Sequence, residues 1–182
     1  TPAPTTGSSI GTFASASPPN GYKADYTTII TGSNVNSNTA LTMYGKYPNF
    51  RTDVAVNANG TTINTRAYFE VGGDKTYTCS DYGGTWSCSD NTAYEAYSSP
   101  ATQASDPDFT FEADGTMVVA GENGTCFKGQ RVSKPEQTFK FCYTTDGILV
   151  YSVSNSGQGY TNEMTATSVV RGIDNSVFTL PA

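Results

Sequence analysis

Short β-type runs recur along this chain at a spacing of about 8–12 residues, separated by clusters of Gly, Asn and Asp. From Tyr22 onward nearly every segment follows this pattern, as where the turn at 57–60 leads into the run at 62–71. Spacing of this kind predicts an all-β fold, either an antiparallel β-sandwich or a strongly curved half-barrel. The exception is 92–104, where spaced Ala and Tyr residues predict a short helix.

The clearest hairpin lies at 137–152. Phe139, Phe141 and Tyr143 alternate with polar residues, so they share one face of a strand. Asp146-Gly147 then provides a turn into the apolar run 148–151. One face of this hairpin should therefore lie against the core.

Residues 1–21 differ in composition from the rest of the chain. They are almost entirely Thr, Ser, Pro, Gly and Ala, and they end in a Pro18-Pro19 pair followed by Asn-Gly. Adjacent prolines favour an extended, stiff connection, and Asn-Gly favours a turn. We therefore divide the chain into an N-terminal arm with a hinge, residues 1–21, and a single β-domain, residues 22–182.

The four cysteines form two local pairs, Cys79 with Cys88 and Cys126 with Cys142. A Gly-Gly turn lies between the first two, and a turn at Lys134-Pro135 separates the strands of the second pair. The alternative, a metal site built from four thiolates, lacks the usual C-x-x-C spacing. We expect two disulfides, which indicate an oxidising compartment or a hot environment.

The residue types that the chain lacks, and its net charge, exclude several classes of function. The chain has no His, which removes Ser-His-Asp and Cys-His catalysis and His-ligated metal sites. A net charge of −6 with unclustered basic residues argues against nucleic acid. The chain contains no run of about 20 apolar residues, so we expect no membrane-spanning helix. The first residues lack the charged start and the apolar stretch of a signal peptide. We expect a mature extracellular or cell-surface chain, with glycosylation sequons at Asn59 and Asn123.

Catalysis could use only carboxylates. A glycosidase needs two of them facing a cleft, and Glu70 and Glu163 lie in strand-like runs without a supporting motif. Strand glutamates commonly face solvent. We therefore expect no enzyme activity, and we keep a β-jelly-roll glycosidase as the third interpretation.

An acidic stretch could bind a hard cation. Asp106, Asp108, Glu112 and Asp114 concentrate oxygen donors, but their spacing matches no EF-hand. We favour a solvated acidic turn over a cation site. No cofactor is predicted, and Ca²⁺ stays an alternative.

The arm contains a strand-length segment, 8–17, with two apolar residues, Ile10 and Phe13. A strand that is donated to the open edge of another copy has this character, because backbone hydrogen bonds supply affinity and alternate side chains set the register. An arm that folds back on its own domain is the alternative. The segment expected to bind the partner comprises Ser9, Ile10, Gly11, Thr12, Phe13 and Ala14.

The arm, the Pro18-Pro19 hinge and the composition resemble the thread- and cannula-type surface-filament subunits of hyperthermophilic archaea. That resemblance implies donor-strand complementation, in which copies of the chain form a helical polymer without a membrane span. The main functional hypothesis is thus a structural subunit that polymerises head-to-tail through an extended N-terminal donor strand.

A second resemblance concerns the runs 26–30, 50–53 and 68–71, which are similar to the opening meander of LolA-like lipoprotein carriers. This likeness implies a half-barrel that binds acyl chains. The chain lacks an N-terminal lipid-bearing Cys. The alternative hypothesis is therefore a secreted LolA-like domain that binds a lipid or another apolar ligand.

Overall fold

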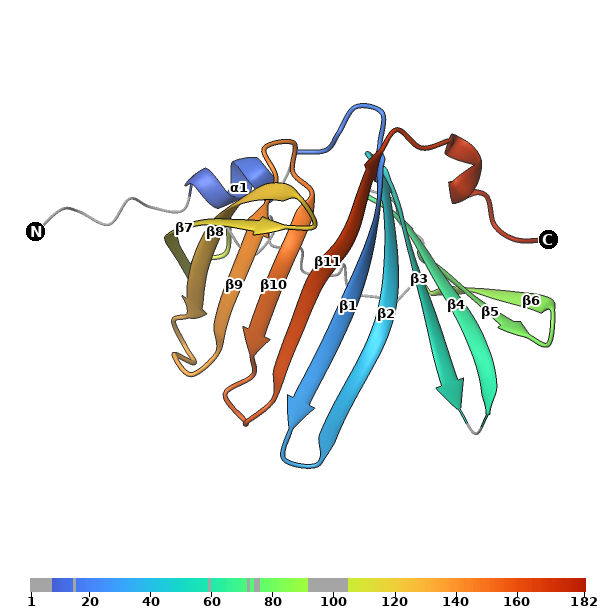
Figure 1. The fold of residues 1–182 in the computed structure, drawn as a ribbon, viewed down its shortest axis with the longest axis horizontal. Helices are drawn as coiled ribbons and strands as arrows, with labels where there is room; N and C mark the ends of the chain where they lie inside the picture. The colour runs from blue at the N-terminus through green and yellow to red at the C-terminus, as the bar shows by residue number, and fades with distance from the viewer. Residues whose placement is uncertain (1–7, 15, 59, 72, 74–75, 92–104) are drawn as a thin grey trace, which may run out of the picture.

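The computed structural model of the chain describes residues 8–14, 16–58, 60–71, 73, 76–91 and 105–182. These residues form one short α-helix, a sheet of eleven strands and a terminal 3-10 helix (Figure 1). The elements are α1 (Ser8–Ala14), β1 (Tyr22–Gly32), β2 (Val35–Lys46), β3 (Asn49–Ala58), β4 (Thr61–Glu70), β5 (Thr76–Tyr82), β6 (Thr85–Asn91), β7 (Phe109–Val119), β8 (Glu122–Arg131), β9 (Thr138–Tyr143), β10 (Leu149–Asn155), β11 (Thr161–Arg171) and η1 (Asn175–Phe178).

Two meanders make up the sheet, in the order β6-β5-β4-β3-β2-β1-β11-β10-β9-β8-β7. The first meander runs outward from β1 to β6, and the second returns from β7 to β11 so that the last strand pairs antiparallel with the first. The sheet is strongly curved and its edge strands, β6 and β7, do not pair, so it is an open half-barrel (Figure 1). The predicted all-β class is confirmed in its half-barrel form.

Alternating side chains explain which face of β1 is buried. Tyr22, Ala24 and Tyr26 are 8%, 0% and 2% exposed, whereas the residues between them are only partly buried. Successive side chains of a strand point to opposite faces, so these three reach the core together. The largest core cluster comprises Tyr22, Ala24, Tyr26, Val119, Cys126, Cys142, Ile148, Val150, Met164 and Ala166.

Bulges accompany the strong curvature. The pairing register shifts between Asp25 and Tyr26, and between Leu149 and Tyr151. An extra residue in one strand bends it and increases the local twist. The Tyr26 hydroxyl donates to the Leu149 carbonyl at 2.7 Å, which ties β1 to the bulge on β10.

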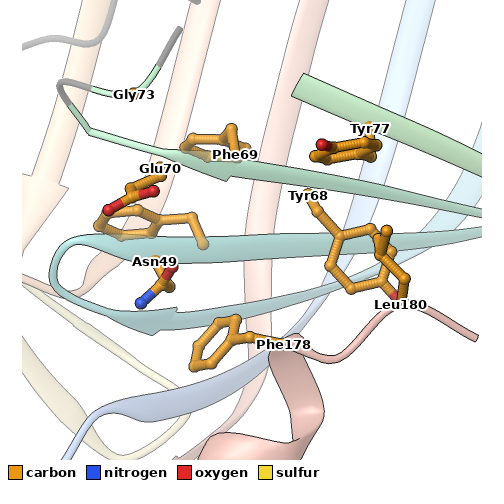
Figure 2. Close-up of a pocket in the computed structure, with 9 residues that line it drawn as sticks. Asn49, Tyr68, Phe69, Glu70, Gly73, Tyr77, Phe178 and Leu180 are labelled. Atoms are coloured by element: carbon orange, nitrogen blue, oxygen red, sulfur yellow. The ribbon is translucent and has the colours of Figure 1, made fainter. Parts of the chain in front are cut away.

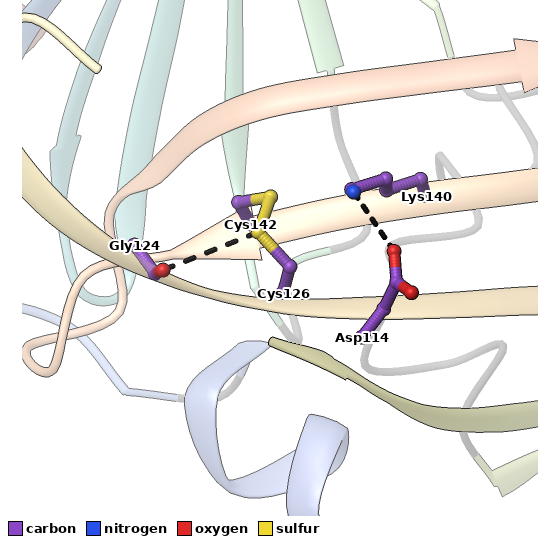
Figure 3. The surroundings of a disulfide bond; sticks show 5 residues. All are labelled: Asp114, Gly124, Cys126, Lys140 and Cys142. Atoms are coloured by element: carbon purple, nitrogen blue, oxygen red, sulfur yellow. Dashed lines mark hydrogen bonds and ion pairs between the residues drawn. A yellow bond between two sulfur atoms is a disulfide. The ribbon is translucent and has the colours of Figure 1, made fainter. Parts of the chain in front are cut away.

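Both predicted disulfides are confirmed. Cys126–Cys142 joins β8 to β9 inside the core, and Figure 3 shows it beside Gly124. A Cβ atom at Gly124 would lie 3.0 Å from Val150 Cγ2 and 3.2 Å from Cys142 Cβ, so a side chain here would fit only if these neighbours shifted slightly. Cys79–Cys88 joins directly opposed residues of the β5–β6 hairpin.

The arm differs from our expectation. Ser8–Ala14 form a helix that packs on the sheet of the same chain, so the predicted extended conformation is wrong for this structure. The reason is the position of the apolar anchors. Ile10 and Phe13 are three residues apart, a spacing that places both on one side of a helix but on opposite sides of a strand. Insertion of the arm into a neighbouring subunit is not tested by a single chain.

Other local predictions meet mixed outcomes. The 137–152 hairpin is confirmed as β9 and β10. The hinge is a turn, in which Gly21 N–H donates to the Pro18 carbonyl at 2.9 Å. Ala113-Asp114-Gly115 form a bulge within one continuous strand, β7, whose pairing register shifts between Ala113 and Thr116. The helix expected at 92–104 lies outside the described residues.

Three side chains from different parts of the sheet, Arg171, Glu122 and Asp146, form a network of ion pairs that we call the ionic clasp. Arg171, at the end of β11, pairs with Glu122 at 2.8 Å and with Asp146 at 2.6 Å. Arg171 lowers the pKa of Asp146 to about 2 and also lowers the pKa of Glu122. The clasp therefore fixes the β7–β8 and β9–β10 hairpins against β11.

Within the described part of the chain, no helix has the length and apolar character to cross a bilayer.

Candidate apolar binding site

Four phenylalanine rings form a continuous apolar surface on one face of β7–β9, which we call the phenylalanine platform. Its members are Phe109, Phe111, Phe139 and Phe141. Neighbouring ring centroids lie 5.7–6.4 Å apart, within the range in which aromatic rings attract one another. Phe141 is buried, whereas the other three are half-buried. The platform therefore presents apolar area that the described fold leaves partly open.

Gly129 allows the rings of two non-adjacent strands to meet. It lies on β8 between Phe111 of β7 and Phe139 of β9. Strands two positions apart are separated by about 9–10 Å, yet the Phe109 and Phe139 rings approach to 5.7 Å. A Cβ atom at Gly129 would lie 2.5 Å from Cδ1 of Phe111, so any side chain there would push this ring away.

Helix α1 covers one end of the same face. Ile10 is 1% exposed and joins a cluster with Phe127, Phe141 and Tyr143. The Phe13 ring lies 5.6 Å from that of Phe127. The helix thus buries one end of the apolar face and leaves the end at Phe109, Phe111 and Phe139 accessible.

A cavity of about 300 Å³ continues the platform toward β1. Phe139 belongs to both features, and Ile30 and Tyr160 provide further apolar surface in the cavity. Its complete lining is Ile30, Gln137, Phe139, Ser154, Asn155, Ser156, Tyr160, Thr161 and Asn162. Platform and cavity together form a curved apolar path across β7–β11 and β1, with amides and hydroxyls along its rim.

Charges around the platform are paired. Arg131 lies 5.6 Å from the Phe109 ring and is bound by Asp108 at 2.5 Å. Hydrogen bonds from Arg131 and Ser133 lower the pKa of Asp108 to about 2, so this carboxylate stays ionised at neutral pH. On the opposite face of β9, where Lys140 points because it alternates with Phe139 and Phe141, Asp114 pairs with Lys140 at 2.8 Å (Figure 3). The platform is therefore bordered at Phe109 by the neutralised Arg131–Asp108 ion pair rather than by net charge.

A second cavity, of about 280 Å³, lies between β3–β5 and the C-terminal segment (Figure 2). Phe50 and Phe69 stack at 5.2 Å beside it, and Phe178 and Leu180 line it from the chain's end. The segment is held by Arg51, whose Nη1 donates to the Val177 carbonyl at 2.7 Å. Because the chain's own terminus already lines it, this cavity is the weaker candidate for an exchangeable ligand.

The acidic residues predicted as a possible calcium site do not converge. Asp108 is engaged by Arg131 and Ser133, and Glu112 and Asp114 by Lys128. Among the described residues no group of three His, Cys, Asp or Glu side chains could hold a metal ion. Calcium binding at Asp106, Asp108 and Glu112 stays an untested alternative.

The two strand glutamates are far apart. Glu70 ends β4 and Glu163 lies on β11, four strand positions away in the sheet. At about 4.8 Å per position this corresponds to about 19 Å along the sheet, beyond the roughly 5–10 Å that a glycosidase pair requires. The glutamates considered for the glycosidase interpretation therefore cannot act together.

The remaining predicted residues have simple positions. In α1, Ile10 is buried, Gly11, Phe13 and Ala14 are partly buried and Thr12 is exposed, while Ser9 is the second residue of the helix. Asn123 is exposed on β8, as an acceptor of a glycan must be, and Asn59 lies outside the described residues. Neither sequon's modification is tested.

Sequence reasoning found half of the platform. The alternation of Phe139 with Phe141 was visible, but their meeting with Phe109 and Phe111 depends on pairing across β8. The available signal was a repeated Phe-x-Phe pattern in two strands that flank a strand with a central glycine. That pattern predicts that the aromatic side chains of the two outer strands meet above the glycine of the strand between them.

The fold and the site define an open antiparallel half-barrel with an aromatic face partly covered by a short helix. No family model matches the chain, and no curated protein matches it. Among solved structures it resembles MucB, with a TM-score of 0.65, 13% identity and coverage of 99% of this chain and 65% of that one. It also resembles a chain of the Pseudomonas aeruginosa MucA/MucB complex, with a TM-score of 0.63, 12% identity and coverage of 96% and 60%.

The chain thus spans less than two thirds of the length of these MucB structures. A LolA superfamily protein from Nitrosomonas europaea is also similar over 96% of this chain and 98% of its own, at 8% identity and a TM-score of 0.49. Identities this low show a shared fold alone.

Proposed function

We propose that this chain is an exported binding protein that holds an apolar ligand, such as an acyl chain, on the phenylalanine platform. One observation carries the proposal: the rings of Phe109, Phe111 and Phe139 are only partly buried, and they continue into the adjoining cavity. Covering apolar area yields roughly 25 cal/mol per Å². A long, thin apolar ligand fits a path of this form better than a compact one.

The structural comparisons support a half-barrel more than a filament subunit. MucB has been solved in complex with MucA, which makes a polypeptide partner an alternative occupant for a half-barrel of this kind. Two disulfides support export to an oxidising compartment. Head-to-tail polymerisation has no support in the comparisons and stays a prediction.

Displacement of a fluorescent fatty acid tests the proposal. cis-Parinaric acid should bind the purified chain saturably, and palmitate should displace it. Phe111→Ser with Phe139→Ser should weaken binding at least about tenfold, because a loss of about 1.4 kcal/mol gives that factor and two aromatic contacts exceed it. Both rings are half-buried, so the doubly substituted chain should stay folded.

Phe69→Ser is the matched control. Its ring is also half-buried but stacks on Phe50 in the first meander, away from the platform. This variant should bind parinaric acid as the unmodified chain does. Absence of saturable binding, or equal loss in the control and the platform variant, would show that the platform is not the binding site.

A further inference from the structure

A second groove, of about 470 Å³, lies on β2–β6, at the opposite end of the sheet from the platform. Its lining mixes polar and apolar side chains, whereas the platform is apolar. Cross-strand pairing brings its side chains into two adjacent rows: Asn64, Asp81 and Trp86 form one, and Thr42, Asp53 and Arg66 form the other. All six lie on one face of the sheet, because alternate residues of each strand share a face.

Arg66 and Trp86 form a flat stacked unit in this groove. The guanidinium carbon of Arg66 lies 4.2 Å from the centre of the Trp86 ring. Nε of Arg66 lies 3.7 Å from Asp53 Oδ2, which tethers the guanidinium in that position. The terminal nitrogens of Arg66 have no hydrogen-bond partner among the described residues, so they are available as donors to a ligand.

Asp81 supplies an acceptor beside this unit. One of its oxygens, Oδ1, accepts from the Gly84 N–H at 2.7 Å and so closes the β5–β6 turn. The other oxygen has no partner within the described part of the chain. Asp81 is paired directly with Trp86 across the two strands, so a free acceptor lies next to an aromatic surface and to free donors.

Charge in the groove is balanced. Asp53 accepts from Nε of Arg51 at 2.6 Å, and Arg51 is buried beside the groove, two residues along the same strand. Two arginines thus balance two aspartates, Asp53 and Asp81. An anionic ligand would meet both carboxylates, and a cationic one would meet the half-buried guanidinium of Arg66. This arrangement favours a neutral ligand that both donates and accepts hydrogen bonds.

We propose that this groove is a binding site for a neutral saccharide, with Arg66, Asp81 and Trp86 as its principal contacts. A sugar hydroxyl donates to a carboxylate and accepts from a guanidinium, which matches Asp81 and Arg66. The C–H face of a pyranose ring is apolar and packs on flat aromatic or guanidinium planes. The volume lies within the range of small-molecule sites, about 300–1,000 Å³. This site is independent of the apolar ligand proposed above.

The chain carries its own probe for this site, because Trp86 is its single tryptophan. Lactose, cellobiose and N,N′-diacetylchitobiose should be titrated separately while tryptophan emission is excited at wavelengths that tyrosine does not absorb. At least one disaccharide should produce a saturable change. Sodium sulfate and spermidine, as anionic and cationic probes, should produce none.

Two conservative variants define the contacts. Asp81→Asn keeps an oxygen for the Gly84 N–H but loses the carboxylate, and Arg66→Lys loses the planar fork. Each should weaken disaccharide binding about tenfold, corresponding to the loss of one charge-assisted hydrogen bond. Ser87→Ala is the control, since Ser87 is exposed on β6 and points to the opposite face. Parinaric acid binding should not change in any of the three.

The proposal is overturned if none of the disaccharides changes Trp86 emission saturably, or if sulfate or spermidine does so instead. It is equally overturned if Asp81→Asn and Arg66→Lys bind disaccharide as tightly as the Ser87→Ala control.

Discussion

Replacing Ile10 with Ala should release helix α1 from the sheet without unfolding the domain. Ile10 is 1% exposed and is the most deeply buried residue of the helix. Full burial of an isoleucine side chain stabilises a protein by about 1.5–3 kcal/mol. A helix of seven residues is not stable alone in water, and ordering its backbone costs about 1 kcal/mol or more per residue.

The free energy of docking α1 is therefore a small difference between the gain from burying its apolar side chains and the entropy cost of ordering its backbone. Ile10→Ala should remove about 2 kcal/mol of it, toward the low end of measured isoleucine truncations because the helix can leave rather than keep a cavity. That loss changes the ratio of docked to undocked helix by about 30-fold. Once the helix leaves, Phe127, Phe141 and Tyr143 lose their cover.

Three measurements follow the release. Amide hydrogen exchange in residues 8–14 should become fast while exchange in β9 stays slow. A dye that fluoresces on apolar surfaces should brighten under native conditions, and parinaric acid should bind more tightly. The free energy of unfolding in urea should fall by no more than about 2 kcal/mol. Thr12→Ser, an exposed change in the same helix, should leave all of these unaltered.

The reasoning is refuted if Ile10→Ala lowers the free energy of unfolding by about 4 kcal/mol or more while α1 amides stay protected. That combination is the behaviour of a core residue that leaves a cavity, and α1 would then be part of the domain's core rather than a separable cover.

Three further predictions concern the disulfides and the ion pairs of Arg171. Mild reduction under native conditions should open Cys79–Cys88 before Cys126–Cys142, since Cys88 is exposed and the second pair is buried, and alkylation with peptide mass spectrometry checks the order. Loss of the second disulfide should cost about 0.5 kcal/mol more, because it closes a loop with a sequence separation of 16 rather than 9. The clasp should make stability pH-dependent: Arg171 holds the pKa of Asp146 at about 2, below its ordinary value of 3.8, so its contribution is complete above about pH 4 and is lost as the pH falls through about 2. The thermal midpoint of Asp146→Asn should therefore fall less between pH 4 and pH 2 than that of the unmodified chain, and an equal fall would contradict the clasp.

Local patterns predicted most of the sheet because nearly all of its strand pairings join strands that follow one another in the sequence. The pairing of β1 with β11 is the exception within the described sheet, so two strand-like runs with a turn between them were enough to imply each of the other pairings. The same locality explains the two disulfides, each of which joins directly opposed residues of one hairpin. No local sequence pattern predicts the pairing of β1 with β11. The sequence therefore could not distinguish a β-sandwich from a half-barrel.

The site was harder to predict because it depends on contacts between side chains of strands that are not adjacent in the sheet. Gly129 has no chemistry of its own, and its effect appears only when Phe111 and Phe139 are known to flank it. Arg66 and Trp86 lie on strands two positions apart and meet across β5. The arm was misjudged for a different reason: its composition fits a strand, but the interval between Ile10 and Phe13 fits a helix.

Two residues of the arm, Ile10 and Phe13, connect the filament hypothesis with the ligand-binding hypothesis. Ile10 and Phe13, which the sequence marked as anchors for a neighbouring subunit, are in contact with the chain's own aromatic face. They can fill only one acceptor at a time, so an arm that inserts elsewhere must first uncover Phe127, Phe141 and Tyr143. A ligand that extends along the platform under α1 would favour that uncovered state. By thermodynamic reciprocity, whatever captures the arm elsewhere must then strengthen binding of the ligand by the same factor. If the arm inserts elsewhere and a ligand binds under α1, arm position and platform occupancy are therefore coupled.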